Sequence, residues 1–337
     1  MLTTPLLWMV LTAATVADQP PAQPAARVLK VEGRITVLNA ADESRAAAAL
    51  DTLYVGERVI VPTGGQVVLA FRSEGRLERL KPGSRVTVNQ DGCVPKSAVE
   101  TVTAPEAHRR TVDRAVRQLQ PEGPAAATIV RAPPPPGDTS TTSRPRTGNQ
   151  VRRPIDGASI LTDRPDFAWP AAPKVLGYEF HLFAEGKEVW VVSVHDPRVS
   201  YAGEQALQPH VDYIWEVSAV FSEDRKEELA GGYFVIAAEE LRQQAAAMEE
   251  LAAHDDSTFV ALAAAWYDEN QLIGEAIAAY ERLASRESSS PACWSALGRL
   301  YQQADREAEA EKAFEKARQL RGPQRPVRRR FFERLRQ

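Results

Sequence analysis

The amino-acid sequence predicts a multidomain β plus α protein, in which two all-β modules precede a set of paired α-helices. Three observations predict it. Residues 28–102 and 155–236 alternate apolar with polar positions, and turn residues interrupt them about every 8–12 positions. A proline-rich stretch lies between them. From residue 257 the apolar period becomes helical, and the pattern of 260–283 returns over 294–317.

The composition excludes several classes of protein. Of the 337 residues, 44% are hydrophobic and 26% are charged, as in soluble globular proteins. A multi-span membrane protein and a wholly disordered chain are therefore excluded. The net charge of -4 gives no global basic field, so nucleic acid is not an expected partner. Two cysteines, Cys93 and Cys293, exclude a disulfide-dense scaffold and a four-thiolate zinc site, and we expect two separate thiols.

Residues 1–17 are typical of a signal peptide. The apolar run from Leu6 to Val16 is shorter than the ~20 residues of a transmembrane helix, and no charged side chain precedes Asp18. Small residues predict cleavage after Ala17, and an uncleaved anchor is the alternative. Because no second run of about 18 apolar residues follows, we expect a mature chain without a transmembrane span, exported to the periplasm or the cell exterior.

The first β module covers residues 28–102. Apolar residues alternate around Gly33, and turns are predicted at Gly64-Gly65 and Pro82-Gly83. This spacing of short strands and turns favours a sandwich or barrel-like module.

Residues 103–154 are predicted to form a short helix followed by a linker. Glu106 to Gln120 carries an apolar stripe at helical spacing, whereas the four prolines from Pro133 to Pro136 favour an extended chain. Residues 104–153 contain nine arginines against four acidic residues, so the linker is locally positive.

Residues 155–236 predict a second, smaller β-sandwich of six or seven strands. Three tryptophans, Trp169, Trp190 and Trp215, lie in apolar β-like runs. We expect them in the core, and the alternative is a platform that stacks on carbohydrate.

The C-terminal third is predicted to be helical. A connecting helix over 237–256 precedes two helical pairs over 257–324, and a basic tail over 325–337 can act as a capping helix or contact a polyanion. The second copy of the repeat carries aromatic and small residues in register with the first. These are Trp294, Leu297, Gly298, Tyr301, Ala310, Phe314 and Ala317.

This period and residue pattern resemble the tetratricopeptide repeat (TPR) family. The resemblance implies stacked helical hairpins in which Gly298 and Ala310 allow close approach of the helices and the aromatic residues fill the space between them. It also implies a groove that binds a protein or peptide. The candidate groove residues are Trp266, Asp268, Arg299 and Gln302, on the first helix of each pair.

Two further resemblances concern the β modules. The N-terminal one resembles the FecR-protein domain family, which implies an extracytoplasmic domain that senses or relays envelope signals. The stretches that carry this resemblance are Val31-x-Gly33-x-Ile35-x-Val37, Leu53-x-x-Gly56-Glu57-x-Val59, Thr63 to Phe71, Gly75-Arg76-Leu77 and Pro82 to Val86. The second module resembles a fibronectin type III or related immunoglobulin-like sandwich. Its Leu207-x-Pro209-x-x-x-Tyr213-x-Trp215 stretch is typical of a tyrosine corner.

The sequence contains no pattern that predicts catalysis. It lacks a phosphate-binding loop, a GxSxG elbow and an HExxH motif. None of the five histidines pairs with another His or Cys at metal-ligand spacing, although His181 and His195 could meet across strands. We expect Asp255-Asp256 to serve the N-terminus of the next helix and Cys293 to be a buried small residue. No catalytic, cofactor-binding or metal-binding residue is predicted.

Together these features predict an exported, non-catalytic binding or scaffold protein of the bacterial envelope, whose helical pairs hold a protein or peptide. One alternative is an envelope signal-transducing regulator built on the FecR-like module. Another is a protein that binds cell-wall or other anionic polymers through its Arg-rich linker and tail.

Overall fold

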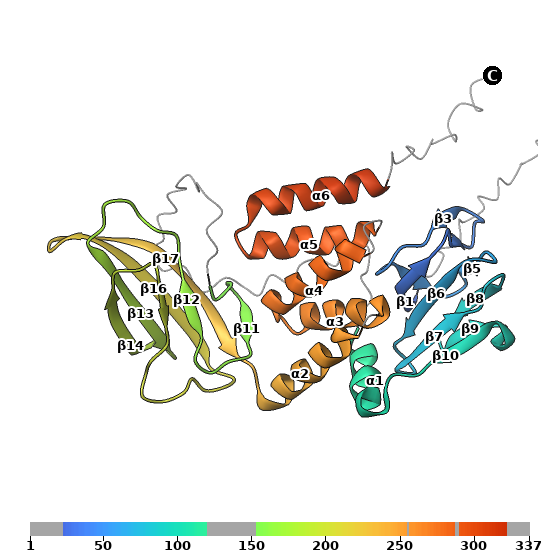
Figure 1. The fold of residues 1–337 in the computed structure, drawn as a ribbon, viewed down its shortest axis with the longest axis horizontal. Helices are drawn as coiled ribbons and strands as arrows, with labels where there is room; N and C mark the ends of the chain where they lie inside the picture. The colour runs from blue at the N-terminus through green and yellow to red at the C-terminus, as the bar shows by residue number, and fades with distance from the viewer. Residues whose placement is uncertain (1–22, 120–152, 255, 287–289, 322–337) are drawn as a thin grey trace, which may run out of the picture.

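The computed structural model describes residues 23–119, 153–254, 256–286 and 290–321, and it is a mixed β plus α structure. Six α-helices lie between an N-terminal β module and a second β module (Figure 1). The predicted signal peptide, most of the proline-rich linker and the basic tail lie outside the described residues.

The N-terminal module consists of two five-stranded sheets. One sheet has the order β10-β7-β6-β1-β4 and the other β3-β2-β5-β8-β9, and all pairings are antiparallel. The strands are β1 Pro24–Glu32, β2 Thr36–Leu38, β3 Ser44–Ala46, β4 Thr52–Tyr54, β5 Arg58–Ile60, β6 Gln66–Phe71, β7 Arg76–Leu80, β8 Arg85–Asn89, β9 Gly92–Val94 and β10 Val99–Val102. The predicted β structure of residues 28–102 is confirmed, and its first strand begins at Pro24.

Apolar side chains from both sheets form the core of this module. Val28, Val37, Val59, Leu69 and Val88 are fully buried in it. The sheet that contains β1 and β6 also buries its other face, because Leu29, Val68, Ala70 and Leu77 pack against helices. A strand buried on both faces is nearly continuous in apolar residues, which is the pattern of β6.

The second module contains a five-stranded sheet of order β11-β17-β16-β13-β14 and a two-stranded sheet of β12 and β15. The strands are β11 Ala158–Ile160, β12 Asp166–Ala168, β13 Gly177–Ala184, β14 Lys187–Val194, β15 Arg198–Ser200, β16 Asp212–Ser222 and β17 Arg225–Ile236. Tyr213 stands near the start of β16, and its hydroxyl accepts a 2.8 Å hydrogen bond from the backbone N–H of Gln208. The local geometry predicted for this tyrosine is therefore present.

Aromatic rings fill the core of the second module. Trp169 and Trp215 are buried, and the Phe180 ring stacks on both. Trp190 is partly buried and meets Tyr201 edge-on. The prediction that these tryptophans are core residues is confirmed, and burial excludes Trp169 and Trp215 as a surface that stacks on sugars.

The helices repeat with the predicted period. The first pair consists of α3 Ser257–Glu269 and α4 Ile273–Arg286, and the second of α5 Pro291–Gln303 and α6 Glu307–Arg321. The displacement from Ser257 to Pro291 equals that from Ile273 to Glu307. The turns between the paired helices also correspond, because Gln271 and Asp305 both have φ 56°. α1 Arg109–Gln118 and α2 Glu239–Ala253 precede the repeat.

Side-chain caps begin the first helix of each pair. The Asp256 carboxylate accepts a hydrogen bond from the backbone N–H of Thr258 at 2.9 Å, as predicted for the acidic residues before α3. Ser290 accepts from the Cys293 N–H at 3.1 Å, and Pro291 occupies the first helical position, where its missing N–H costs nothing.

One apolar core runs across the predicted domain boundaries. It joins Leu29 and Ala70 of the N-terminal sheet to Val116 of α1, to almost all of α3, and to Ala158 of β11. The predicted boundaries mark changes of secondary structure, while the packing continues through them.

Candidate functional site

The first candidate groove residue, Trp266, does not face a groove. Its side chain is 1% exposed, and its indole Nε1 donates a 2.6 Å hydrogen bond to Oε1 of Gln118 on α1. The expectation that Trp266 contacts a partner is therefore wrong. Trp266 is buried because of tertiary packing. α1 and β1 cover α3, whose residues from Thr258 to Tyr267 are all buried.

Two ion pairs hold β1 along α3. Lys30 Nζ lies 3.5 Å from Asp256 Oδ1 at the N-terminus of α3, and Arg27 Nη1 lies 3.8 Å from Glu269 Oε1 at its C-terminus. The chain itself therefore covers α3, on which the groove residue Trp266 was predicted.

The other three candidate residues lie near the ends of α3 and α5. Asp268 and Arg299 form an ion pair that links the two helices, and the Tyr280 hydroxyl donates to the same carboxylate at 3.5 Å. Arg299 and Gln302 are exposed and lie three residues apart on α5. The structure therefore brings Asp268 and Arg299 together and leaves Arg299 and Gln302 accessible.

All seven repeat residues are at least partly buried. Leu297, Gly298, Tyr301, Ala310 and Ala317 are buried, and Trp294 and Phe314 are partly buried. A Cβ atom at Gly298 would lie 2.6 Å from the Phe314 ring, so this position requires glycine for the observed approach of α5 and α6.

Tyr301 also belongs to a polar cluster at the turn between α5 and α6. Its hydroxyl donates to Glu281 Oε1 at 2.7 Å, and the Arg306 guanidinium lies 4.3 Å from the centre of its ring. Burial and the neighbouring Glu281 carboxylate raise the pKa of Tyr301 above its ordinary value, so the hydroxyl stays protonated.

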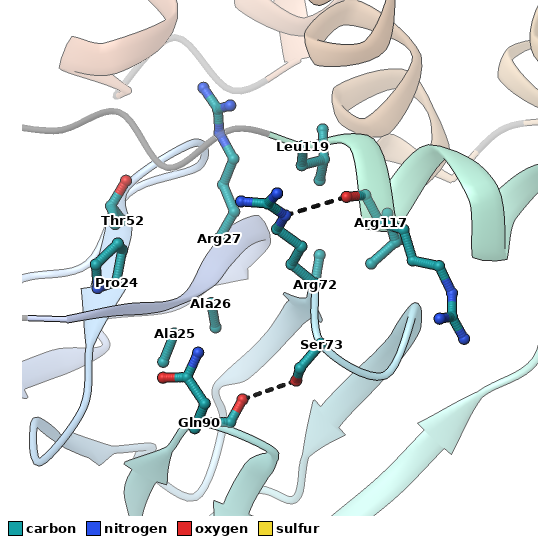
Figure 2. A pocket seen from close by; sticks show the side chains of 12 residues that line it. Pro24, Ala25, Ala26, Arg27, Thr52, Arg72, Ser73, Gln90, Arg117 and Leu119 are labelled. Atoms are coloured by element: carbon teal, nitrogen blue, oxygen red, sulfur yellow. Dashed lines mark hydrogen bonds between the residues drawn. The ribbon is translucent and has the colours of Figure 1, made fainter. Parts of the chain in front are cut away.

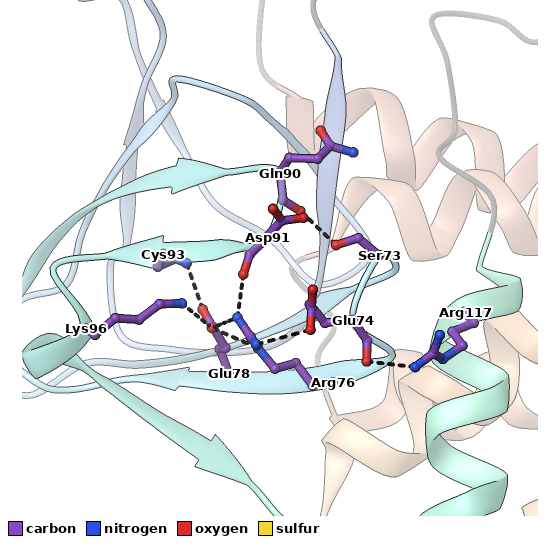
Figure 3. A network of polar contacts seen from close by, with 9 residues as sticks. All are labelled: Ser73, Glu74, Arg76, Glu78, Gln90, Asp91, Cys93, Lys96 and Arg117. Carbon is purple, nitrogen blue, oxygen red and sulfur yellow. Dashed lines mark hydrogen bonds and ion pairs between the residues drawn. The ribbon is translucent and has the colours of Figure 1, made fainter.

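A buried carboxylate organises a polar network in the N-terminal module. Glu78 on β7 is 2% exposed and accepts hydrogen bonds from Arg76 at 2.9 Å, Lys96 at 3.1 Å and the Cys93 backbone N–H at 2.8 Å (Figure 3). Gly92 has φ 126°, and a Cβ there would lie 2.5 Å from atoms of this network. Two cations and a backbone donor satisfy the charge of Glu78, which gives the network a structural role.

The two cysteines are separate and buried, as predicted. Burial raises the pKa of the Cys93 thiol, and the nearby Glu78 carboxylate raises it further. A thiol held protonated in this way is a poor nucleophile.

His181 and His195 do not form the pair considered from the sequence. The His181 ring lies on the outer face of the second module, where Nδ1 is 2.6 Å from Glu188 Oε2 and Nε2 is 3.0 Å from Glu179 Oε1. Partial burial lowers the pKa of His181, but hydrogen bonds to the two carboxylates outweigh it, so the pKa is raised above 6.5.

We expect the His181 ion pairs to make stability depend on pH. Because the folded pKa is raised, their contribution is complete below the unfolded value of about 6.5 and is lost as pH rises through the folded pKa. Urea unfolding of wild type and H181Q, compared from about pH 5.5 to about pH 8.5, should give a stability difference that shrinks with rising pH. A difference independent of pH would contradict this.

Two pockets stand out in the part of the chain that the structure describes. One, of about 420 Å³, opens between β1, the end of β6 and α1 (Figure 2). The other, of about 510 Å³, lies between β11, β12 and α4. Sequence reasoning identified neither pocket, because each is lined by segments far apart in the chain.

Within the described ranges, no helix is long and apolar enough to cross a bilayer. The same ranges contain no group of three or more His, Cys, Asp or Glu side chains arranged to hold a metal ion.

Comparison with known proteins assigns no family. No protein family and no curated protein matches the sequence. A solved structure titled "Cell surface anchoring domain" is 24% identical over 20% of this chain and 87% of its own length, with a TM-score of 0.19. A likeness at that score carries no argument about fold or function, so function is inferred from the geometry described above.

Proposed function

We propose that the protein is an exported, non-catalytic binding protein of the bacterial envelope, periplasmic or extracellular, whose TPR-like helical pairs act as a frame. The frame holds a FecR-like module on one side and a fibronectin type III-like module on the other. It presents the exposed side of α5 to a protein or peptide partner.

The shared apolar core is the observation that carries the proposal. Side chains from the N-terminal sheet, α1, α3 and β11 pack into one cluster, so the two β modules are fixed to the same helical unit. A binding protein gains affinity when its contact surfaces are held in place before the partner arrives, because less entropy is lost on association.

The open part of the frame lies on the second helical pair. Arg299, Gln302 and Gln303 are exposed on α5, and the Arg299 side chain retains 46% exposure despite its ion pair with Asp268. Arginine is enriched where protein partners bind, whereas α3 contains no arginine and its residues from Thr258 to Tyr267 are buried.

Affinity capture from envelope extract with the full chain tests the proposal. We expect R299A/Q302A to lose a specific partner that the wild type retains at moderate salt. E311A/K312A, which removes two exposed charged residues from α6, is the matched control and should retain it. Equal capture by both variants, or no specific partner with the wild type, would contradict the proposed surface.

A further inference from the structure

One edge of the five-stranded sheet in the second module is open. The order β11-β17-β16-β13-β14 places β11, which contacts α4, at one edge and β14 at the other. Figure 1 shows β14 on the side of the module that is away from the helices. Within the described ranges, β14 pairs with β13 alone. The backbone groups along its other side can therefore pair with one more strand.

Most of β14 lacks the features that protect such an edge. Residues 189–194 form the uncharged run VWVVSV, which is rich in the β-branched and aromatic residues that favour strands. Proteins commonly place lysine or proline in an edge strand, because both oppose pairing with another chain. A bulge lies near the start of β14, and it leaves Trp190 to Val194 in regular register with β13. This part of the edge is suited to pairing.

Both faces of β14 leave apolar surface accessible to solvent. On the outer face of the sheet, the Val189 and Val191 side chains are 45% and 50% exposed. On the inner face, Trp190, Val192 and Val194 are only partly buried against the core of the module. A further strand at this edge would cover part of each of these side chains, because directly opposite residues in a sheet have their Cβ atoms about 4.5–5.5 Å apart.

The charges at the two ends of β14 indicate which strand pairs with it. Lys187 and Glu188 precede the uncharged run, and all four flanking charged or titratable residues are exposed. The other two, His195 and Asp196, follow the run. When a second copy pairs antiparallel about a two-fold axis, the start of one strand meets the end of the other. Each junction then contains groups of opposite charge.

The alternation of side chains restricts how two copies can pair. A two-fold axis that relates two antiparallel strands of one sheet is perpendicular to the sheet, so each residue lies opposite one from the same face. An axis at Val192 satisfies this condition, and Val191 then lies opposite Ser193 of the second copy. Like charges directly opposite each other oppose pairing, and an uncharged run avoids them when it meets its own copy.

The bulge brings opposite charges together in this register. In the ladder with β13, β14 has one extra residue between Glu188 and Trp190. Because of this extra residue, Glu188 lies opposite His195 of the second copy. Lys187 lies opposite Asp196 of the second copy in the same way. The two-fold axis repeats both contacts, so four pairs favour a second copy over an unrelated strand.

We propose that β14 pairs antiparallel with β14 of a second copy of this chain, with the axis at Val192. The pairing joins the two five-stranded sheets into one continuous sheet. The same strand is used on both sides, so the assembly closes at a dimer. This contact is separate from the proposed partner surface on α5, so either can fail without the other.

Analytical ultracentrifugation of the full chain over a range of concentrations tests the pairing. We expect a reversible dimer in the wild type and a dissociation constant higher by about tenfold or more in V191K, because a lysine from each copy then lies beside the axis. V191T stays uncharged and should dimerise like the wild type. I214K is the matched control. Ile214 is 48% exposed on the same face, but its strand β16 is flanked by β13 and β17, so I214K should also dimerise normally.

An exchange of charge tests the register. K187E places two carboxylates opposite each other and should weaken the dimer, and K187E/D196K should restore it. If the double variant dimerised no better than K187E, the assigned pairing would be wrong.

Three results in the first experiment would overturn the proposal. They are a chain that stays monomeric at about 0.5 mM, equal dimerisation of V191K and wild type, and equal losses in V191K and I214K. The last result would place the contact on the outer face of the sheet instead of at its edge.

Discussion

Trp266→Ala is expected to destabilise the N-terminal β module together with the helices. The side chain is 1% exposed, packs edge-on against Tyr267 and donates to Gln118 of α1. Truncating a fully buried tryptophan costs about 3–5 kcal/mol, a large part of the roughly 5–15 kcal/mol that stabilises a folded domain. The loss of stability should extend from α3 to β1 and α1, because the three elements pack within one core.

Hydrogen exchange measured segment by segment checks this expectation. In W266A, the backbone amides of β1, β6 and α3 should lose protection together, whereas those of β13 and β16 should change little, because the second module has its own core. W215A is the matched control, since Trp215 is equally buried in that other core. It should expose β13 and β16 and spare β1.

The opposite result has a clear meaning. If W266A reduced protection in α3 while β1 and β6 kept theirs, the N-terminal module would fold independently of the helices. The rigid frame proposed above would then lose its main support.

Local patterns predicted the elements of this fold well. The alternation of Tyr213, Trp215 and Val217 predicts a strand with one buried face, and β16 has that face. The repeat period predicted the two helical pairs, and α5 and α6 follow α3 and α4 at that same displacement. Such patterns depend on neighbours within a few positions or on self-similarity along the chain, so one sequence is enough to read them.

The candidate site was harder to predict because it depends on contacts between distant segments. Trp266 lies on the first helix of a pair, where we predicted a groove, but its partner Gln118 is 148 residues earlier. Arg27 was not recognised as a residue that lines the pocket beside β1, because the strand around it, Pro24–Glu32, is buried on both faces and does not alternate apolar with polar residues. The alternation of Ala70 with Arg72 places both residues on one face of the chain. It indicates the pocket only when β6 is known to pair with β1, because Ala70 then lies opposite Arg27.

Gly298→Val is expected to disrupt the last helical pair. A Cβ atom at this position would lie 2.6–2.8 Å from three atoms of the Phe314 ring, closer than carbon atoms normally approach. Valine adds two further methyl groups, and overpacking of this kind typically costs about 1–3 kcal/mol. The better helix propensity of a non-glycine residue offsets at most about 1 kcal/mol. Urea unfolding should show a net loss.

The double variant G298V/F314A separates this clash from other effects. If Phe314 is the obstacle, removing its ring makes room for valine, so the double variant should be less destabilised than the sum of the two single variants. Gly274→Ala on α4 is the matched control, because a Cβ there meets nothing within 4 Å and should leave stability unchanged or raise it by up to about 1 kcal/mol. If the losses of stability in the double variant were additive, the packing of α5 on α6 would not depend on this contact. The small size of Gly298 opposite the Phe314 ring would then not explain how the second helical pair packs.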